Sequence, residues 1–520
     1  MAQIIINERD NTVPTGGSQS TDIAYVPGFA NTNWNCYILT VAGATPADPN
    51  GDGTLTDAIA PNGTVSGKPM PSREDYNAGG HLTTPQYVVN TFDSKAWYLS
   101  VGTGTSSSNE WLECTVYASP SPENEPTLCL SVADFEENFG KSAYKFSSAD
   151  VGNDRTEFPT FETDAGSMSY KFEDFEKSYI YARELISSGL PVIYDNYAKR
   201  TNYKKDAIVV KDLYKNMADM FENISDLGEV SVKYITSGAY PVYELDDESI
   251  TDDPLNAMCN CAVTRGDAVA IIDHTDNPGR ALTGDNSVFA SINSEDSVAF
   301  FSTAGENNGT YGEYSTLFTP WSISKTTTAG KQSMPGSFSY LLALARSIKN
   351  NSNILAISGV ARGLVPQIVN LNTTSKLTNK IADSYQGKTG IAINPITQIQ
   401  PYGLTIWGNR TLLNNVTGLT AHSFLNTRNM VNDIKKLCYN VAKSLMFEQN
   451  SEQLWIKFKA GIIPTLNQMQ SSQGMSKYVI SKGSTNEKAK LVANIAIYPI
   501  YAVEEIEINI SLEDEEVTVE

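Results

Sequence analysis

The feature that most constrains the fold is a helical segment that passes through a glycine into a short apolar strand. Residues 172–194 contain it as FEKSYIYARELISSG followed by LPVIY. A helix, a glycine and an apolar strand in this order form an α/β unit. Comparable units recur in DAIVVKDLYKNMADMFENI, PLNAMCNCAVTRGDAVAIID and SFSYLLALARSIKN. Residues 126–370 are therefore predicted to form an α/β middle domain.

The flanking regions have a different character. Residues 26–125 combine Gly, Thr, Ser, Asn and Pro with short β-type runs such as QYVVNTF and AWYLSV, which predicts a loop-rich β module. Residues 371–505 predict a C-terminal core domain with an amphipathic helix over 421–447, a second helix that Pro464 bends or ends, and closing strands. The fold class is therefore α+β and multidomain, with extended terminal strands.

The two ends of the chain look like arms. Residues 1–25 form an N-terminal arm with a short apolar strand and a polar linker, and residues 506–520 form a C-terminal arm with strict alternation. A lone strand needs partners for its backbone and a cover for its apolar face, so we predict pairing with neighbouring subunits. The alternative is a strand that folds back on its own sheet. The predicted subunit-interface residues are Ile4, Ile5, Ile6, Ile506, Ile508, Ile510 and Leu512.

Charge and cysteine content exclude several classes of protein. The formal net charge of −21, from 59 acidic and 38 basic residues, argues against nucleic-acid binding, which needs a basic surface. Of six cysteines only Cys259 and Cys261 are close together, and a single C-x-C pair favours free buried thiols over zinc. We see neither a signal peptide nor an apolar run of the ~18 residues that a membrane span needs, so we expect cytoplasmic folding without direct membrane insertion.

A phosphate-loop spacing occurs in two near-matches: FGKS at residues 139–142, which has Phe135 in place of the first glycine, and ADSYQGKT at residues 382–389. A working phosphate loop follows a buried strand and opens a helix whose N-terminus faces the phosphates. Here the preceding SKLTNKI is too polar for a buried strand, and the following GIAINPI is β-like and contains proline. The sequence therefore predicts no nucleotide binding and no cofactor.

A calcium-loop pattern occurs at residues 48–59, DPNGDGTLTDAI. Asp48, Asn50 and Asp52 occupy the first, third and fifth ligand positions of such a loop. The twelfth position is Ile59 instead of a bidentate glutamate. The segment is better explained as a solvated turn, with a weak calcium site as the alternative, so no metal is predicted.

Hydrolytic chemistry has few candidate residues. The chain has three histidines and contains neither G-x-S-x-G nor H-E-x-x-H. His274, which follows Asp273 at a predicted strand end, could serve as a general acid or base, although such a histidine is more often a loop residue. We predict no catalytic residues and no enzyme.

The stretch YGLTIWGNRTL at 402–412 carries a resemblance to a known family. An aromatic-Gly-x-Arg-Thr run after a strand is similar to a segment of the contractile tail sheath proteins of bacteriophages and related contractile injection systems. Neighbouring segments resemble the same family in order: VADFEENFG (132–140), RGDAVAIID (265–273), MPGSFSYLLALAR (334–346), GIAINPI (390–396) and the helical region 424–455. The residues of the run are Trp407, Gly408, Arg410 and Thr411. Glycine permits a sharp turn, and arginine can brace an acidic or carbonyl-rich contact.

The resemblance implies a structural protein of the virion tail, assembled in the host cytoplasm. Such subunits form hexameric rings stacked helically around a tail tube, with tube, baseplate and tail terminator proteins as partners. Contraction drives the tube through the host envelope for genome ejection, and it uses no cofactor. In this setting residues 26–125 are expected to face outward. The alternatives are a secreted β-rich calcium-dependent adhesin and an α/β hydrolase-like enzyme.

Overall fold

The protein is described by a computed structural model. It describes residues 22–28, 63–65, 86–90, 95–100, 110–114, 126–139, 172–196, 217–226, 230–243, 253–274, 287–305, 309–327, 330–349, 355–371 and 390–504. The helices are α1 (Val132–Phe139), α2 (Phe172–Ser188), α4 (Pro254–Arg265), α5 (Val288–Ile292), α6 (Glu295–Phe301), α7 (Gly336–Lys349), α8 (Gly359–Arg362), α10 (Leu425–Leu445) and α11 (Glu452–Ser471), with 3-10 turns η8 (Gly312–Tyr314) and η9 (Ala421–Ser423).

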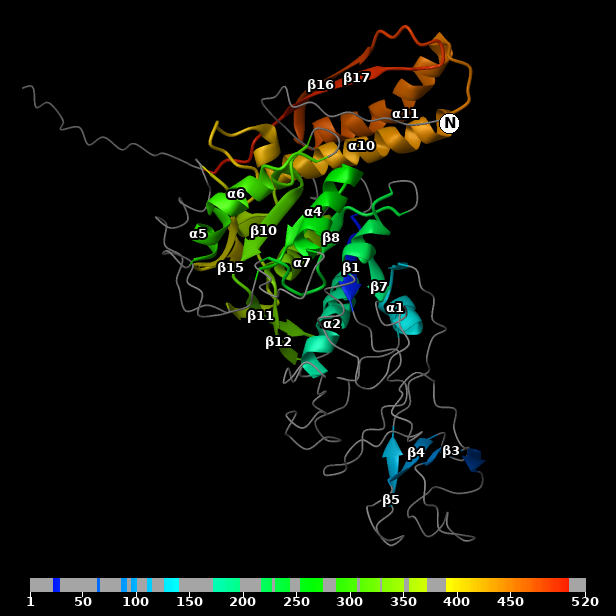
Figure 1. Ribbon diagram of the computed structural model, residues 1–520, viewed down its shortest axis with the longest axis vertical. Helices are drawn as coiled ribbons and strands as arrows, with labels where there is room; N and C mark the ends of the chain where they lie inside the picture. The colour runs from blue at the N-terminus through cyan, green and yellow to red at the C-terminus, as the bar shows by residue number, and fades with distance from the viewer. Residues whose placement is uncertain are drawn as a thin grey trace, which may run out of the picture.

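Within the described residues, the strands form four sheets (Figure 1). The first strands are β1 (Ala24–Gly28), β2 (Gly63–Val65), β3 (Gln86–Asn90), β4 (Lys95–Ser100), β5 (Glu110–Cys114), β6 (Thr127–Cys129), β7 (Val192–Asn196), β8 (Tyr234–Thr236) and β9 (Val269–Ile272). The later ones are β10 (Ser315–Thr319), β11 (Ser322–Thr326), β12 (Gly330–Met334), β13 (Ile368–Leu371), β14 (Asn394–Ile399), β15 (Gly403–Ile406), β16 (Met475–Lys482) and β17 (Ala493–Pro499).

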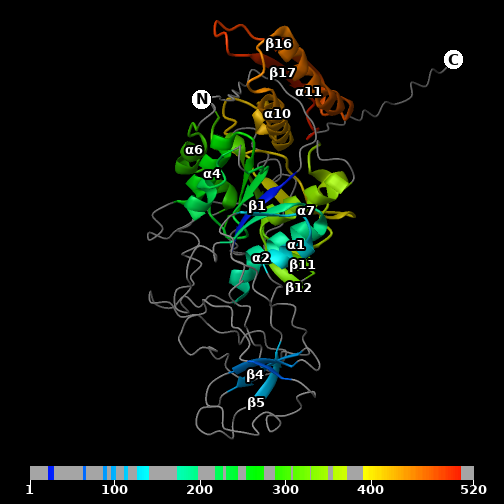
Figure 2. The same cartoon turned by 90° about the vertical axis from the view of Figure 1, so that its right-hand side faces the viewer.

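An eight-stranded sheet in the order β15-β14-β10-β9-β8-β1-β7-β6 forms the centre of the molecule. Its six inner strands are parallel and its two edge strands are antiparallel. Helices cover both faces, with α4 and α6 on one side of β1 and α1, α2 and α7 on the other (Figure 2). Because both faces are covered, the inner strands are apolar and buried, as in VAII of β9. Two of the predicted α/β units supply strands of this sheet, LPVIY for β7 and DAVAIID for β9, whereas residues 206–216 of a further unit lie outside the described residues.

Local sequence signals explain where α4 begins and ends. Asp253 caps the helix by accepting a hydrogen bond from the Leu255 amide, and Pro254 occupies the first turn, where it costs no hydrogen bond. Gly266 ends the helix in the left-handed region, with a φ of 66°. The tight end places Arg265 and Asp267 just before β9.

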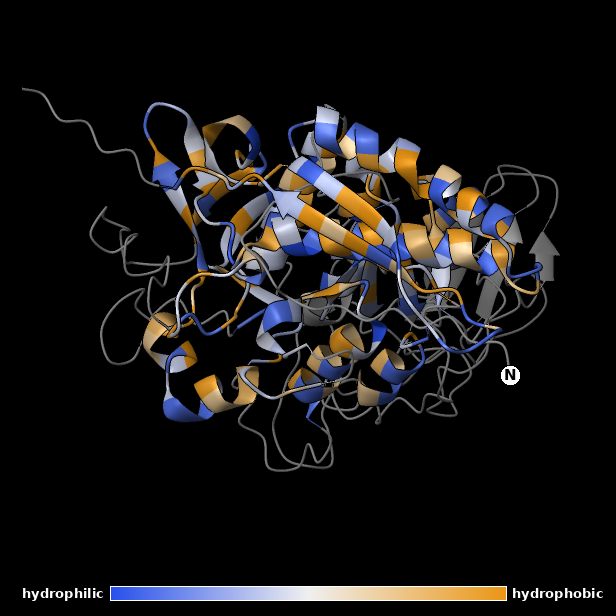
Figure 3. Cartoon of the chain, turned by 90° about the horizontal axis from the view of Figure 1, so that it is seen from above, coloured by the Kyte–Doolittle hydropathy of each residue, from blue (hydrophilic) through white to orange (hydrophobic). Residues whose placement is uncertain are grey.

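The C-terminal module consists of α10, α11 and the β16–β17 hairpin. It has its own hydrophobic core, which includes Met430, Trp455 and Ile462, and the inner faces of both strands pack against it. Figure 3, which looks down on this module, shows hydrophobic and hydrophilic residues alternating along the hairpin. The predicted helix over 421–447 is confirmed as α10, whereas α11 continues past Pro464 instead of ending there.

The sheets cut across the domain boundaries expected from the sequence. The boundary at residue 25 falls inside β1, and β14 and β15 join the eight-stranded sheet although they follow the boundary at residue 370. Strand pairing over long sequence distances decides this division, and local composition does not report it. The β-type runs near 86–90 and 95–100 are strands of a separate four-stranded sheet, β2-β3-β4-β5. Within the described ranges, no helix is long and apolar enough to span a membrane.

Candidate functional site: the Trp-Gly-Asn-Arg-Thr segment and the arm roots

Asn394, at the start of β14, holds the segment that follows β15. Its Oδ1 accepts a hydrogen bond of 2.7 Å from the Arg410 amide, and its Nδ2 donates to the Arg410 carbonyl at 2.9 Å. The same Nδ2 lies 2.9 Å from Thr316 Oγ1 of β10. A Cβ on Gly408 would lie only 2.7 Å from Asn394 Oδ1, so glycine is needed for this close approach. Asn394 thus fixes the run in its path beside β10.

Arg410 ties this segment to the root of the C-terminal arm. Its guanidinium is 2% exposed and binds the Glu504 carboxylate with both Nε, at 3.0 Å, and Nη2. The guanidinium also lies 4.4 Å from the centroid of the Phe424 ring. The centroids of the Phe424 and Tyr501 rings are 4.8 Å apart. Bidentate and stacked contacts of this kind suit arginine and cannot all be made by lysine. The last described residues before the C-terminal arm are therefore held against the main body.

The run also fixes the start of α10. Thr411 Oγ1 donates to the His422 carbonyl at 2.6 Å, and Asn409 Oδ1 accepts from the Asn426 amide at 3.2 Å. The Leu425 amide donates to the Asn409 carbonyl at 3.1 Å. The first turn of α10 therefore receives its hydrogen-bond partners from the run.

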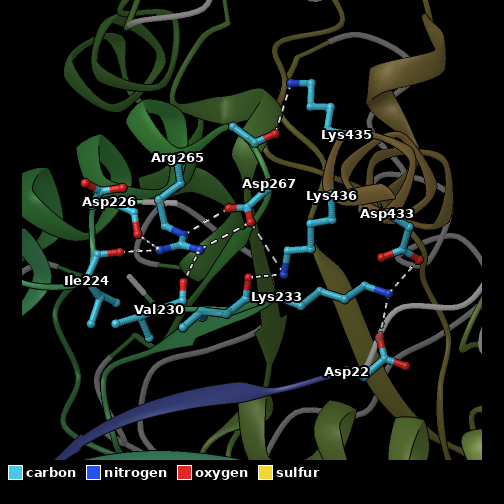
Figure 4. A network of polar contacts seen from close by, with 12 residues as sticks. Asp22, Ile224, Asp226, Val230, Lys233, Arg265, Asp267, Asp433, Lys435 and Lys436 are labelled. Atoms are coloured by element: carbon cyan, nitrogen blue, oxygen red, sulfur yellow. Dashed lines mark hydrogen bonds and ion pairs between the residues drawn. The ribbon is translucent and has the colours of Figure 1, made fainter. Parts of the chain in front are cut away.

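A second polar cluster lies where α10 crosses the amino ends of the parallel strands (Figure 4). Lys233, just before β8, binds Asp22 Oδ1 at 2.5 Å and Asp433 Oδ2 of α10 at 2.9 Å. Burial alone would lower the pKa of Lys233, but the two carboxylates outweigh it and raise the pKa above its usual value. Asp22 lies two residues before β1, at the first described residues of the chain, so this cluster holds the chain where the predicted N-terminal arm meets the sheet.

Further lysines of α10 bind backbone carbonyls at the same strand ends. Lys435 Nζ donates to the Gly266 carbonyl at 3.0 Å and to Tyr314 Oη at 2.8 Å. Lys436 donates to the Val232 carbonyl and lies 3.6 Å from the Asp267 carboxylate. These contacts dock the C-terminal module onto the main sheet through charge-assisted hydrogen bonds.

The carboxyl ends of the strands hold the residues that the sequence offered for acid–base chemistry. Asp273 is buried and accepts hydrogen bonds from the Ser337 amide at 3.2 Å and from Ser337 Oγ at 2.6 Å. Burial raises the pKa of Asp273 to about 7. His274 Nε2 lies 2.8 Å from Thr319 Oγ1, and the His274 carbonyl accepts from Trp321 Nε1 at 2.8 Å. Asp273 therefore caps the start of α7, and His274 is packed against β10.

Several predicted residues lie outside the described part of the chain. These are the interface residues of both arms, the calcium-like ligands Asp48, Asn50 and Asp52, and the phosphate-loop near-match at 382–389. Among the described residues, no group of three or more His, Cys, Asp and Glu side chains could hold a metal. Cys259 and Cys261 are free buried thiols, and burial raises the pKa of each to about 12.

Three solved structures illustrate what the chain is similar to. The PVC sheath complex of an extracellular contractile injection system, in its contracted state, aligns with a TM-score of 0.48 at 14% identity over 75% of this chain and 87% of its own. The contracted helical sheath of the anti-feeding prophage gives 0.47 at 14% identity over 76% and 91%. A sheath tail protein from Desulfitobacterium hafniense gives 0.31 at 9% identity over 58% and 62%.

These neighbours are contractile sheath proteins. They belong to the class that the Trp-Gly-Asn-Arg-Thr run resembles. No protein-family model and no curated protein matches the chain.

Sequence reasoning identified Arg410 and Gly408 but missed their partners. Asn394 stood inside the GIAINPI segment, and Glu504 stood in the closing strand region. The Lys233 cluster gave no local signal, because its three members come from distant parts of the chain. Only buried charge in an otherwise apolar context, as in VKYIT around Lys233, could have drawn attention to it.

Proposed function

We propose that this protein is the structural subunit of a contractile tail sheath. Subunits polymerise as stacked hexameric rings around a tail tube, and contraction drives the tube through a host envelope. The observation that carries the proposal is the Arg410–Glu504 pair, which holds residue 504 against the body of the subunit, just before residues 506–512, whose alternating sequence predicts a strand. A strand that is firmly rooted and then extends with one apolar face is suited to join another subunit.

The β16–β17 hairpin offers a place for such a strand. Within the described residues, the two strands pair only with each other, and their inner faces cover α10 and α11. Both outer edges therefore have backbone groups that a further strand can satisfy. A two-stranded sheet gains stability when strands are added. We propose that the arms of neighbouring copies extend this hairpin, which keeps subunits connected while they move.

The remaining assignments follow from the same proposal. The tail tube, baseplate and tail terminator proteins are the expected partners, and no nucleic acid is bound. Residues 26–28 belong to β1 of the main sheet, and the rest of the predicted 26–125 module is proposed to face outward, because a loop-rich module on the outside obstructs no packing between subunits. The subunit assembles in the host cytoplasm as part of a virion tail and needs neither cofactor nor catalysis.

Negative-stain electron microscopy of the purified full-length protein tests this function. We expect helical cylinders with a central channel. Discrete particles over a range of protein and salt concentrations would contradict the proposal and favour the alternative of a β-rich calcium-dependent binding protein. Calcium titration followed by calorimetry distinguishes the sheath subunit from the calcium-dependent binding protein. We expect no saturable calcium binding at residues 48–59 for a sheath subunit.

A further inference from the structure

We infer that α10 is a rigid link that joins the roots of the two arms, and that the Asp22–Lys233–Asp433 cluster is its anchor for the N-terminal arm. The inference rests on the proposed function in one respect: it holds that α10 carries the force that neighbouring subunits exert on the arms. Its structural part, the coupling of the two roots, concerns the single subunit alone.

The N-terminal root is fixed by a shared cation. Lys233 Nζ lies within 3 Å of carboxylate oxygens of both Asp22 and Asp433, and all three side chains are at most 5% exposed. Burying charged groups is costly unless they are paired closely, so removal of one partner weakens the hold on the others. Asp22 lies two residues before β1, and Asp433 lies in the third turn of α10. A displacement of the N-terminal arm is therefore resisted by α10 and not only by the sheet.

The C-terminal root is fixed at the start of the same helix. Glu504 binds Arg410, whose guanidinium stacks on Phe424, the residue that caps α10. Phe424 also contacts Tyr501. From Phe424 to Asp433 the chain advances nine residues, which is about 14 Å of helix at 1.5 Å per residue. Both roots therefore attach to one short, continuous stretch of helix.

This stretch of α10 is also immobilised on the main body. Its residues from Thr427 to Met430 and from Asn432 to Lys436 are buried, although many of them are polar or charged. Arg428 stacks on Tyr314 at 4.1 Å, and Lys435 donates to the same tyrosine hydroxyl. Buried polar groups need partners, and here the partners of the α10 side chains belong to the main body. A force on either arm is thus transmitted to the root of the other arm through α10, which is held in place by the main body.

Hydrogen exchange of the full-length protein, read by mass spectrometry, tests the coupling. Asp22→Asn is expected to speed exchange about tenfold at residues 430–436 and also to speed it at residues 499–504, since a hydrogen bond to a charged group is lost. Glu504→Gln is expected to speed exchange at residues 430–436 in return. The matched control is Glu136→Gln, which weakens the largely buried Arg183–Glu136 pair between α1 and α2. It should leave residues 430–436 and 499–504 unchanged.

The outcomes decide the inference separately from the proposed function. Unchanged exchange at residues 430–436 in both arm-root variants, or equal acceleration in the control, overturns the link. If Asp22→Asn does not fold, Asp433→Asn tests the same cluster from the helix side, read at residues 22–28. If cylinders form, those of Asp22→Asn should break under shear more readily than those of Glu136→Gln, and equal breakage overturns the mechanical part. Absence of cylinders in the unaltered protein overturns the proposed function and leaves the exchange result standing.

Discussion

The two ends of the parallel strands in the main sheet are used in opposite ways. In open α/β sheets, ligands usually bind outside the carboxyl ends of the strands. Here the carboxyl ends hold Asp273, His274 and Trp321, which bind neighbouring strands and helices of the same subunit. The amino ends instead carry Lys233 and the lysines of α10, together with the root of the N-terminal arm.

This difference indicates what the sheet does in this protein. Its carboxyl ends are filled by side chains that close the core, and its amino ends dock the C-terminal module through buried charges. The sheet acts as a frame whose amino ends position α10. Substitutions at the two ends should therefore have different consequences.

The largest effect is expected at the amino ends, for Lys233→Met. The substitution removes the cation that Asp22 and Asp433 share and leaves two carboxylates buried together. We expect a loss of about 3–5 kcal/mol in the free energy of unfolding, measured by urea denaturation. Lys457→Met, which breaks the exposed pair with Glu448, is the control and should cost less than about 1 kcal/mol. Equal effects of the two substitutions would contradict the importance given to the amino-end cluster.

At the carboxyl ends the expected effect depends on pH. Burial raises the pKa of Asp273 from 3.8 to about 7, so the protonated carboxyl stabilises the fold below pH 3.8, and this contribution is lost as pH rises through 7. Between pH 3.8 and pH 7 the free energy of unfolding of the unaltered protein should fall by as much as about 4 kcal/mol. That of Asp273→Asn should not show this fall. Urea denaturation of both proteins at several pH values measures the difference. Parallel stability curves would show that folding does not raise the pKa of Asp273.

A smaller effect on stability is expected in the Trp-Gly-Asn-Arg-Thr run, which lies between the sheet and α10. Gly408→Ala places a methyl group 2.8 Å from Asn394 Cα, which forces the run away from β10. We expect a cost of about 1–3 kcal/mol in the free energy of unfolding, as for overpacking elsewhere. Ser481→Ala, at an exposed hairpin position, is the control and should be neutral. A neutral Gly408→Ala would mean that the close approach to Asn394 is not required.

The sequence indicated the regular elements better than their partners. The length and period of α10 and the cap residues of α4 are local signals, and both helices were predicted. The contacts that unite them are not local: Lys233 and Asp433 are 200 residues apart, and Arg410 and Glu504 are 94 apart. A single sequence contains no signal that pairs one buried lysine with one aspartate among many. For the same reason, the predicted boundary at residue 370 separated strands that belong to one sheet.

The smallest effect is expected far from both ends of the sheet. Deletion of residues 48–57 should leave polymerisation unchanged, because a loop in an outward-facing module takes no part in subunit contacts. Electron microscopy of the deletion protein measures it. A folded monomer that no longer polymerises would contradict the outward placement of residues 26–125.

The most direct test of the account is truncation after Glu505, compared with the full-length protein by negative-stain electron microscopy. The truncated protein keeps Glu504 and its pair with Arg410, and it lacks residues 506–512, for which the alternating sequence predicts a strand. We expect helical cylinders from the full-length protein and a soluble, folded monomer from the truncated one, with circular dichroism confirming the fold. Normal cylinders from the truncated protein would contradict the claim that the C-terminal arm joins neighbouring subunits.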